Sequence, residues 1–242
     1  MPSTAAGLPP FVGREEESAE LDRALSAARA GRGALVLVVG EPGIGKTRLA
    51  DEFTARARAQ GDRVLWGRAW EGGGAPPFWP WVEIVRGLVA EAGADALVSL
   101  LGERSRELVR LLPELGERLP ETQRPAGLDA ERARFLLFDA TATLLRVAAE
   151  TVPAVLVLDD LHAADQPSLL LLRFVAPTLP TSRLVVLVLL REAEVRASRW
   201  IAELVGQLGR EGRRVPLRGL AEADVAELVR GRTGRSAAPA SS

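Results

Sequence analysis

The 242-residue sequence contains no cysteine, no tyrosine and no asparagine, and it has a single histidine. Without cysteine the chain can form neither a disulfide nor a cysteine-ligated zinc site, and one histidine argues against a histidine-based metal site. A formal net charge of −1 and a pI near 6.1 provide no overall attraction to nucleic acid or acidic lipid. The composition therefore excludes disulfide-stabilised and cysteine-ligated zinc proteins.

Long apolar segments are also missing. No apolar run reaches the roughly 18 residues that a membrane span requires, and the run Leu184–Leu190 has the length of a strand. Met1–Pro10 has neither the basic region nor the apolar region of a secretory signal. We therefore expect a cytoplasmic protein without a membrane partner. Because 47% of its residues are hydrophobic, we expect one α/β domain with a substantial core and a small appendage.

Lysine is almost absent as well. Lys46 is the only lysine among 31 lysine and arginine residues, a bias that indicates a GC-rich genome. A lysine kept against this bias is expected where arginine cannot replace it. A phosphate site is such a place, because a compact ammonium fits between β- and γ-phosphate oxygens and a broad planar guanidinium does not.

Lys46 lies in a glycine-rich octet, residues 40–47, that fits the pattern G-x-x-x-x-G-K-[ST]. Ala34–Val39 before it has the pattern of a buried strand, and Arg48–Gln60 after it has that of a helix. In this setting backbone N–H groups and the helix N-terminus hold phosphates, while Thr47 Oγ1 reaches Mg²⁺. The alternative is a glycine-rich turn that only mimics the motif. The residues expected to bind ATP are Gly40, Glu41, Pro42, Gly43, Ile44, Gly45, Lys46, Thr47 and Arg48.

Strand and helix patterns alternate along the chain, which is typical of a parallel sheet with helices on both faces. The expected strands are Ala34–Val39, Arg63–Gly67, Ala154–Leu158, Leu184–Leu190 and Arg214–Leu217. The expected helices are Glu15–Ala30, Arg48–Gln60, Trp81–Ala92, Ala94–Leu112, Asp129–Thr151, Gln166–Ala176, Arg199–Arg210 and Glu222–Arg232. The sequence therefore predicts an α/β fold of the P-loop NTPase type. Its parallel five-stranded sheet has flanking helices and a helical insertion between strands two and three.

Four segments are expected along the chain. We expect a disordered N-terminus at 1–10 and a P-loop ATPase domain at 11–219, with the helical insertion at about 81–151. We interpret 220–234 as the start of a truncated helical lid domain. Residues 235–242 are small, polar and proline-containing, so we expect a disordered tail there.

An acidic pair follows the third expected strand. Asp159 and Asp160 come directly after the apolar run Val155–Leu158, which places them at the carboxyl edge of the sheet, where ligands bind. Asp159 is expected to join Thr47 in the Mg²⁺ shell, and Asp160 is expected to polarise the attacking water. The alternative is a strand that ends in a solvated acidic turn.

Several segments together resemble the AAA-type ATPase module of large bacterial STAND regulators. They are Phe11–Glu15, Gly40–Ala50, Leu158–Asp165 and Ser168–Leu169. Such modules occur in LuxR-type transcriptional regulators and in ATPases attached to nucleotide cyclases. Trp70–Trp81 is similar to a marker of one actinobacterial branch. The resemblance covers about Phe11 to Gly234 and implies an AAA/STAND-like fold.

The resemblance also implies roles for residues outside the octet. It assigns Val12, Gly13 and Arg14 to the base end of the nucleotide pocket, and it makes Arg191 a sensor of the γ-phosphate. It implies a nucleotide-dependent switch that uses Mg²⁺, binds ATP or ADP, self-associates when ATP binds and is reset by slow hydrolysis. DNA would be contacted only through C-terminal domains absent from this sequence.

The sequence departs from the family pattern at two places near the expected site. Ala163 replaces a usual tryptophan, and Leu189-Leu190 replaces a usual Thr-Tyr pair. Loss of the two hydroxyls favours slow hydrolysis. Among other candidates, His162 is interpreted mainly as a strand-end residue, Trp79 and Trp81 as cover for the helical insertion, and Arg213-Arg214 as solvated surface.

Three functions remain open from the sequence. The first is a regulatory switch that binds ATP and hydrolyses it slowly. The second is a self-sufficient turnover ATPase, either an AAA-like motor or a small-molecule kinase. The third is a module that holds ATP or ADP structurally with negligible hydrolysis.

Overall fold

A five-stranded parallel sheet forms the centre of the computed structural model, which describes residues 11–72, 74–118 and 129–233. The order across the sheet is β2-β3-β4-β1-β5, and every neighbouring pair is parallel. The strands are β1 (Ala34–Gly40), β2 (Arg63–Arg68), β3 (Ala154–Asp159), β4 (Leu184–Arg191) and β5 (Arg213–Pro216). The predicted α/β fold with a parallel five-stranded sheet is confirmed.

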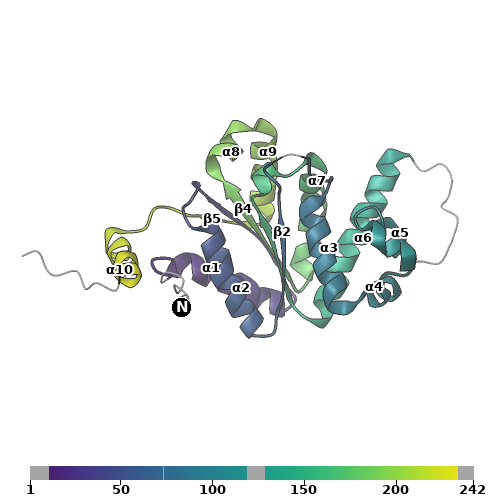
Figure 1. The fold of residues 1–242 in the computed structure, drawn as a ribbon, viewed down its shortest axis with the longest axis horizontal. Helices are drawn as coiled ribbons and strands as arrows, with labels where there is room; N and C mark the ends of the chain where they lie inside the picture. The colour runs from purple at the N-terminus through teal and green to yellow at the C-terminus, as the bar shows by residue number, and fades with distance from the viewer. Residues whose placement is uncertain (1–10, 73, 119–128, 234–242) are drawn as a thin grey trace, which may run out of the picture.

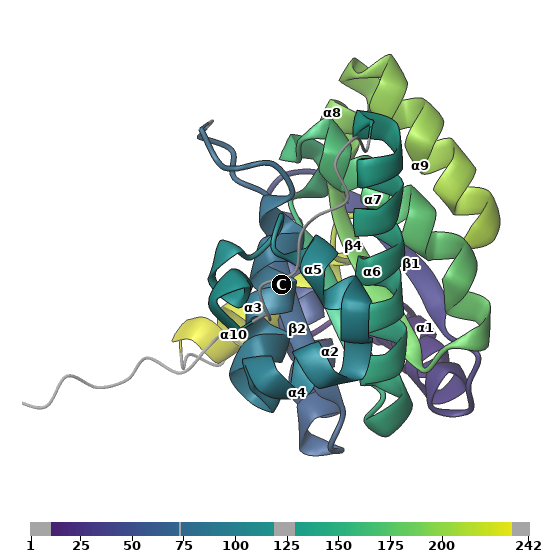
Figure 2. The same cartoon turned by 90° about the vertical axis from the view of Figure 1, so that its right-hand side faces the viewer.

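Helices cover both faces of the sheet, because the central strands are apolar on both sides. Successive side chains of β1 enter different clusters: Leu37 belongs to one and Val38 to the other. The cluster of Val38 is closed by α1 (Glu15–Arg29) and α2 (Lys46–Ala59). The opposite cluster is closed by α3 (Trp79–Ala92), α6 (Ala130–Thr151), α7 (Gln166–Val175) and α9 (Arg199–Glu211), as Figures 1 and 2 show.

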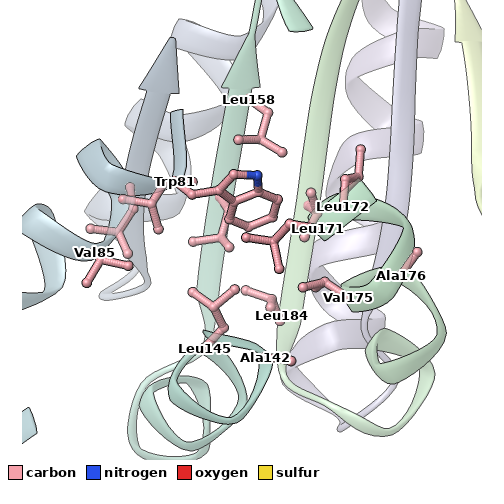
Figure 3. Packing of buried hydrophobic residues seen from close by; sticks show 14 of the residues in the cluster. Trp81, Val85, Ala142, Leu145, Leu158, Leu171, Leu172, Val175, Ala176 and Leu184 are labelled. Atoms are coloured by element: carbon pink, nitrogen blue, oxygen red, sulfur yellow. The ribbon is translucent and has the colours of Figure 1, made fainter. Parts of the chain in front are cut away.

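Trp81 lies at the centre of the larger cluster, where Leu158, Leu171 and Leu172 surround its ring (Figure 3). The side chain is fully buried, and its Nε1–H donates to the Ser168 carbonyl at 3.0 Å. A buried indole needs such an acceptor, because an unpaired N–H would cost free energy. Trp81 was predicted to cover the helical insertion, but it lies inside the core, where its indole links α3 to α7.

The helical insertion between β2 and β3 is less regular than the sequence predicts. In place of one helix over Ala94–Leu112, the chain forms α4 (Ala94–Leu101), a 3₁₀ turn at Gly102–Arg104 and α5 (Ser105–Leu108). Gly102 has φ 55° and ψ −129°, which a continuous α-helix does not allow. The apolar periodicity continues across the break, and Leu101, Leu108 and Leu112 are all buried. A 3₁₀ segment at Pro113–Arg118 follows.

Smaller differences concern element ends. The fifth strand lies one residue earlier than predicted, and α8 (Glu192–Ala197) was not predicted. Short 3₁₀ helices at Leu161–Ala163 and Ala176–Thr181 flank α7, and α10 (Glu222–Thr233) is the last helix described. The segments predicted to be disordered, 1–10 and 235–242, lie outside the described residues. None of the described helices combines the length and the hydropathy that a membrane span requires.

Candidate functional site

The glycine-rich octet forms a loop that leaves β1 and enters α2. Gly43 (φ 74°) and Gly45 (φ 103°) adopt left-handed conformations, and a Cβ added to either would meet no atom within 4 Å. Glycine is therefore required here by backbone conformation rather than by crowding, and the space around the loop is open. Backbone N–H groups at the start of α2 are suited to an anion in that space. The loop thus fits a phosphate group.

Lys46 is the first residue of α2 and is 7% exposed. Its Nζ donates to the carbonyls of Gly40 at 3.0 Å and Glu41 at 2.9 Å, so the ammonium lies against its own loop. An ammonium has three donors, which leaves one for a ligand. Burial, followed by the positive charge of Arg191, lowers the pKa of Lys46.

Thr47 and Asp159, the two residues expected to hold Mg²⁺, lie together. Thr47 Oγ1 donates to Asp159 Oδ2 at 3.5 Å, although they follow β1 and β3, with β4 between these strands. The side chain of Asp159 is 2% exposed, and its Oδ1 accepts from the Asp160 N–H at 2.9 Å. A hydroxyl and a carboxylate oxygen are the hard ligands that Mg²⁺ uses in proteins, so this pair fits the ion.

Arg68 binds the carboxylate of Asp159, although the sequence did not predict it as a site residue. It ends β2 as the register partner of Asp159, and its Nε and Nη2 donate to Oδ2 at 3.1 and 2.8 Å. The guanidinium is 60% exposed, whereas the carboxylate is buried. Aligning the carboxyl ends of β2 and β3 would have identified Arg68, but that alignment requires knowing that the two strands are neighbours.

Arg191 ends β4 opposite Gly40, at the start of the phosphate loop. Its Nη2 contacts Glu71 Oε1 and lies 3.5 Å from Asp160 Oδ1, and its Nη1 lies 3.7 Å from Glu194 Oε1. The two residues predicted to be catalytic, Asp160 and Arg191, are therefore neighbours. Glu71 was missed, because nothing in the sequence indicates that the loop after β2 lies beside β4. Glu194 was missed as well, although its i,i+3 spacing from Arg191 could have identified it.

Asp160 also has an unusual backbone. With φ 51° it is one of two non-glycine residues in the left-handed region within the described chain, the other being Phe78. Aspartate tolerates this region better than most residues, yet the conformation still costs free energy. The end of β3 is therefore a place where the fold holds a residue in a sparsely populated backbone conformation, directly after a buried carboxylate.

His162 belongs to the same cluster. Its side chain is 4% exposed, Nε2 lies 3.5 Å from Glu71 Oε1, and Nδ1 has no hydrogen-bond partner among the described residues. Burial, followed by the positive charge of Arg191, lowers the pKa of His162. The ring is thus neutral near pH 7, and it packs against the carboxylate of Glu71 rather than forming a charged pair with it.

The segment expected at the base end, Val12 to Arg14, connects to two distant parts of the chain. Arg14 Nη2 donates to the carbonyls of Ile44 at 3.2 Å and Arg218 at 2.8 Å, and Nη1 contacts Glu17 at 3.1 Å. Gly13 has φ 66°, and a Cβ there would lie 2.4 Å from the Asp224 carboxylate on α10. A groove of about 680 Å³ is lined by residues that include Gly13, Arg14, Pro216, Arg218, Gly219 and Asp224.

Three other predicted positions are placed as follows. Arg48 forms an ion pair with Glu52 along α2 at 2.5 Å. Leu189 and Leu190 are buried in the two opposite clusters, so hydroxyls at these positions would enter the core. The geometry gives no support to the interpretation that this pair faces the nucleotide.

Comparisons with known proteins identify a family for the chain. The AAA ATPase domain family matches residues 10–189. A curated relative, an uncharacterized protein of Rhizobium meliloti (strain 1021), is 30% identical over 172 residues, which are 66% of this chain but 16% of the relative. The chain thus spans about a sixth of that protein.

Among solved structures, one similar chain is a STAND protein (signal transduction ATPase with numerous domains) with a tetratricopeptide repeat sensor from Pyrococcus horikoshii. It is 20% identical, with a TM-score of 0.46, and the match covers 93% of this chain and 26% of that one. The family match spans more than half of the sequence and contains both the phosphate loop and the acidic strand end. The chain belongs to the AAA ATPase domain family.

Proposed function

We propose that the chain is a nucleotide switch module that binds ATP with Mg²⁺ and hydrolyses it slowly. The observation that carries this proposal is the meeting of Thr47, at the start of α2, with Asp159, at the end of β3, beside the buried Lys46. Glycines in left-handed conformations, an inward lysine and paired hard oxygens are together what a nucleoside triphosphate with Mg²⁺ requires. A simple acidic turn would not explain this convergence.

Each residue would have a role in nucleotide binding or hydrolysis that follows from its position. Lys46 and the loop N–H groups would hold the phosphates, and Thr47 with Asp159 would hold Mg²⁺, which neutralises phosphate charge when bound. Asp160 would orient the attacking water, and Arg191 would contact the γ-phosphate. Val12, Gly13 and Arg14 would lie at the base end, beside the groove that they share with the segment after β5.

Slow hydrolysis is supported by the ion pairs already present. Arg68 engages Asp159, and Arg191 engages Asp160 together with Glu71. Each of these partners would have to exchange before the carboxylates and Arg191 could serve the nucleotide. A site that must rearrange its own charges is suited to switching between two states, following the logic of γ-phosphate switches.

The wider setting follows from the resemblance of Phe11–Glu15 and the acidic strand end to STAND regulators. We infer that the module acts in the cytoplasm within a LuxR-type signalling protein and self-associates when ATP binds. DNA would be contacted by other domains of that protein. The curated relative, about six times longer than the matched segment, is compatible with such a multidomain parent.

Loss of binding in Lys46→Ala tests the assignment of the loop. We expect nucleotide affinity to fall at least about tenfold, because a charged hydrogen bond to phosphate is lost. Titration with a fluorescent ATP analogue measures this, and circular dichroism checks the fold. Arg58→Ala, an exposed position on the same helix, is the matched control and should bind like the wild type. Equal affinity of Lys46→Ala and wild type would refute the proposal.

Turnover separates the three candidate functions. For a switch we expect complete hydrolysis in a single turnover but a multiple-turnover rate well below the ~10 s⁻¹ typical of enzymes. Rapid multiple turnover would favour a self-sufficient ATPase. Bound nucleotide without any hydrolysis would favour a structural ATP or ADP module, which the engagement of both aspartates by arginines also suits.

A further inference from the structure

Glu71 lies on the loop after β2 and contacts Arg191, although no feature of the sequence marks it as a site residue. The contact joins Glu71 Oε1 to Arg191 Nη2 and is the closest of the three carboxylate contacts of this guanidinium. The loop and the end of β4 are 120 positions apart in sequence. Such a pair must be set by the fold, because no local periodicity would bring the two residues together.

The other two carboxylates hold Arg191 less closely. Asp160 lies at 3.5 Å on the constrained backbone after β3, and Glu194 lies at 3.7 Å on the next turn of the chain. Glu71 is the most exposed of the three, at 48% against 39% for Glu194 and 25% for Asp160, and it lies on a loop rather than in a helix or directly after a buried strand. It is therefore the carboxylate that can leave Arg191 with the least rearrangement of the core.

The position of Arg191 determines what would replace Glu71. Arg191 pairs in register with Gly40, the first residue of the phosphate loop, and its positive charge lowers the pKa of Lys46, so its guanidinium lies near the phosphate end of the site. A guanidinium pairs equally well with a carboxylate and with a phosphate. A γ-phosphate in that space would compete with Glu71 for one arginine, whereas a diphosphate would lack the competing group.

We propose that Glu71 is a positioning residue that holds Arg191 in the absence of a γ-phosphate and thereby limits the preference of the site for ATP over ADP. The proposal rests on the proposed function, since it concerns the γ-phosphate contact of Arg191. His162 contributes by packing its Nε2 side against Glu71 at 3.5 Å, which gives the carboxylate a defined resting place.

The expected effect appears in the comparison of two nucleotides. Removing the carboxylate in Glu71→Gln should lower the Kd of ATP about two- to fivefold, the range for a half-exposed ion pair, while the Kd of ADP stays unchanged. Salt should weaken the difference, because the pair is accessible to solvent. Fluorescence titrations with ATP and ADP analogues in the presence of Mg²⁺ measure both constants.

A double-mutant cycle tests whether Glu71 acts through Arg191. Arg191→Ala should weaken ATP binding, and Glu71→Gln combined with Arg191→Ala should equal Arg191→Ala alone. The matched control is Glu192→Gln, because among the described residues the Glu192 carboxylate forms ion pairs with Arg196 at 2.7 Å and Arg214 at 3.9 Å but not with Arg191. It should leave both nucleotide affinities unchanged. Glu71→Ala should reproduce Glu71→Gln, and melting temperatures check that each variant is folded.

Each outcome decides the proposal. If Glu71→Gln weakens ATP and ADP equally, Glu71 is a structural residue of the loop and the proposal is wrong. If ATP binds more tightly even without Arg191, or if the ATP-to-ADP ratio does not change, Glu71 does not act through that arginine. These results leave ATP binding by the wild type intact, whereas a wild type that binds neither nucleotide overturns the proposed function and this inference together.

Discussion

At the scale of single residues, the site pairs its charges internally. Asp159 is matched by Arg68, and Asp160 is matched by Arg191. A buried carboxylate such as Asp159 needs a counter-charge, because an isolated charge in the protein interior is costly. The arginines therefore stabilise the acidic strand end in the same places where Mg²⁺ and phosphate would otherwise neutralise it.

Arg68 provides a direct test of this competition. Because Arg68 and Mg²⁺ would use the same Asp159 oxygen, Arg68→Gln should lower the Mg²⁺ concentration needed for half-maximal ATP binding by about three- to tenfold. A Mg²⁺ titration with a fluorescent ATP analogue gives this midpoint. The control is Arg63→Gln. In the wild type Arg63 lies at the other end of β2 and pairs with Glu91, so this variant should leave the Mg²⁺ midpoint unchanged. A higher midpoint in Arg68→Gln would show that Arg68 orients Asp159 for the metal.

At the scale of elements, the break at Gly102 distinguishes backbone conformation from packing. Gly102 in the insertion and Gly206 within α9 are both exposed, and an added Cβ meets no atom within 4 Å at either. Only Gly102 has a positive φ. Gly102→Ala should therefore destabilise the protein by about 1–2 kcal/mol, whereas Gly206→Ala should stabilise it by about 0.5–1 kcal/mol.

Urea unfolding at constant m-value measures both changes. An equal change in stability in the two variants, of either sign, would indicate that the left-handed conformation of Gly102 adds no cost of its own and does not control the break. An unchanged stability in Gly102→Ala would indicate that α4 and α5 can join into one helix without cost.

The helices and strands also show which parts of the fold can be predicted from the sequence. The strands and α2 are predictable, because apolar runs and the phosphate loop are local signals. The break at Gly102 is not, since the apolar spacing of Leu101 and Leu108 continues through it. The partners of the aspartates are not predictable either. Arg68 meets Asp159 only because β2 lies beside β3, and strand order is a property of the whole sheet.

At the scale of the whole molecule, the buried histidine links the site to stability. Its folded pKa lies below the ordinary value of 6.5, so the unfolded chain binds more protons near that pH. Stability should therefore be complete above pH 6.5 and should fall as the pH decreases from 6.5 through the folded pKa. The slope from this group is at most about 1.4 kcal/mol per pH unit. The charged groups around the ring are Glu71, Asp160, Arg191 and Glu194.

Unfolding free energies at pH 7.5 and pH 5.5 check this expectation. Carboxylates titrate over the same range, so the comparison is made with His162→Gln, which keeps a polar side chain of similar reach. The wild type should lose more stability between the two pH values than the variant does. Equal losses would mean that folding does not lower the pKa of His162.

Arg14 ties together parts of the molecule that are far apart along the chain. One guanidinium nitrogen bonds the carbonyl of Arg218, 204 positions away, and also the carbonyl of Ile44 in the phosphate loop. Arg218 lies shortly before α10, which stands apart from the sheet in Figure 1. A movement of α10 that shifts Arg218 would therefore act on the same guanidinium nitrogen that bonds the phosphate loop. The N–H of Leu217, next to Arg218, also donates to the Val39 carbonyl at 2.8 Å, so a force applied from that side of the molecule would reach the start of the loop by a side-chain route and a backbone route together.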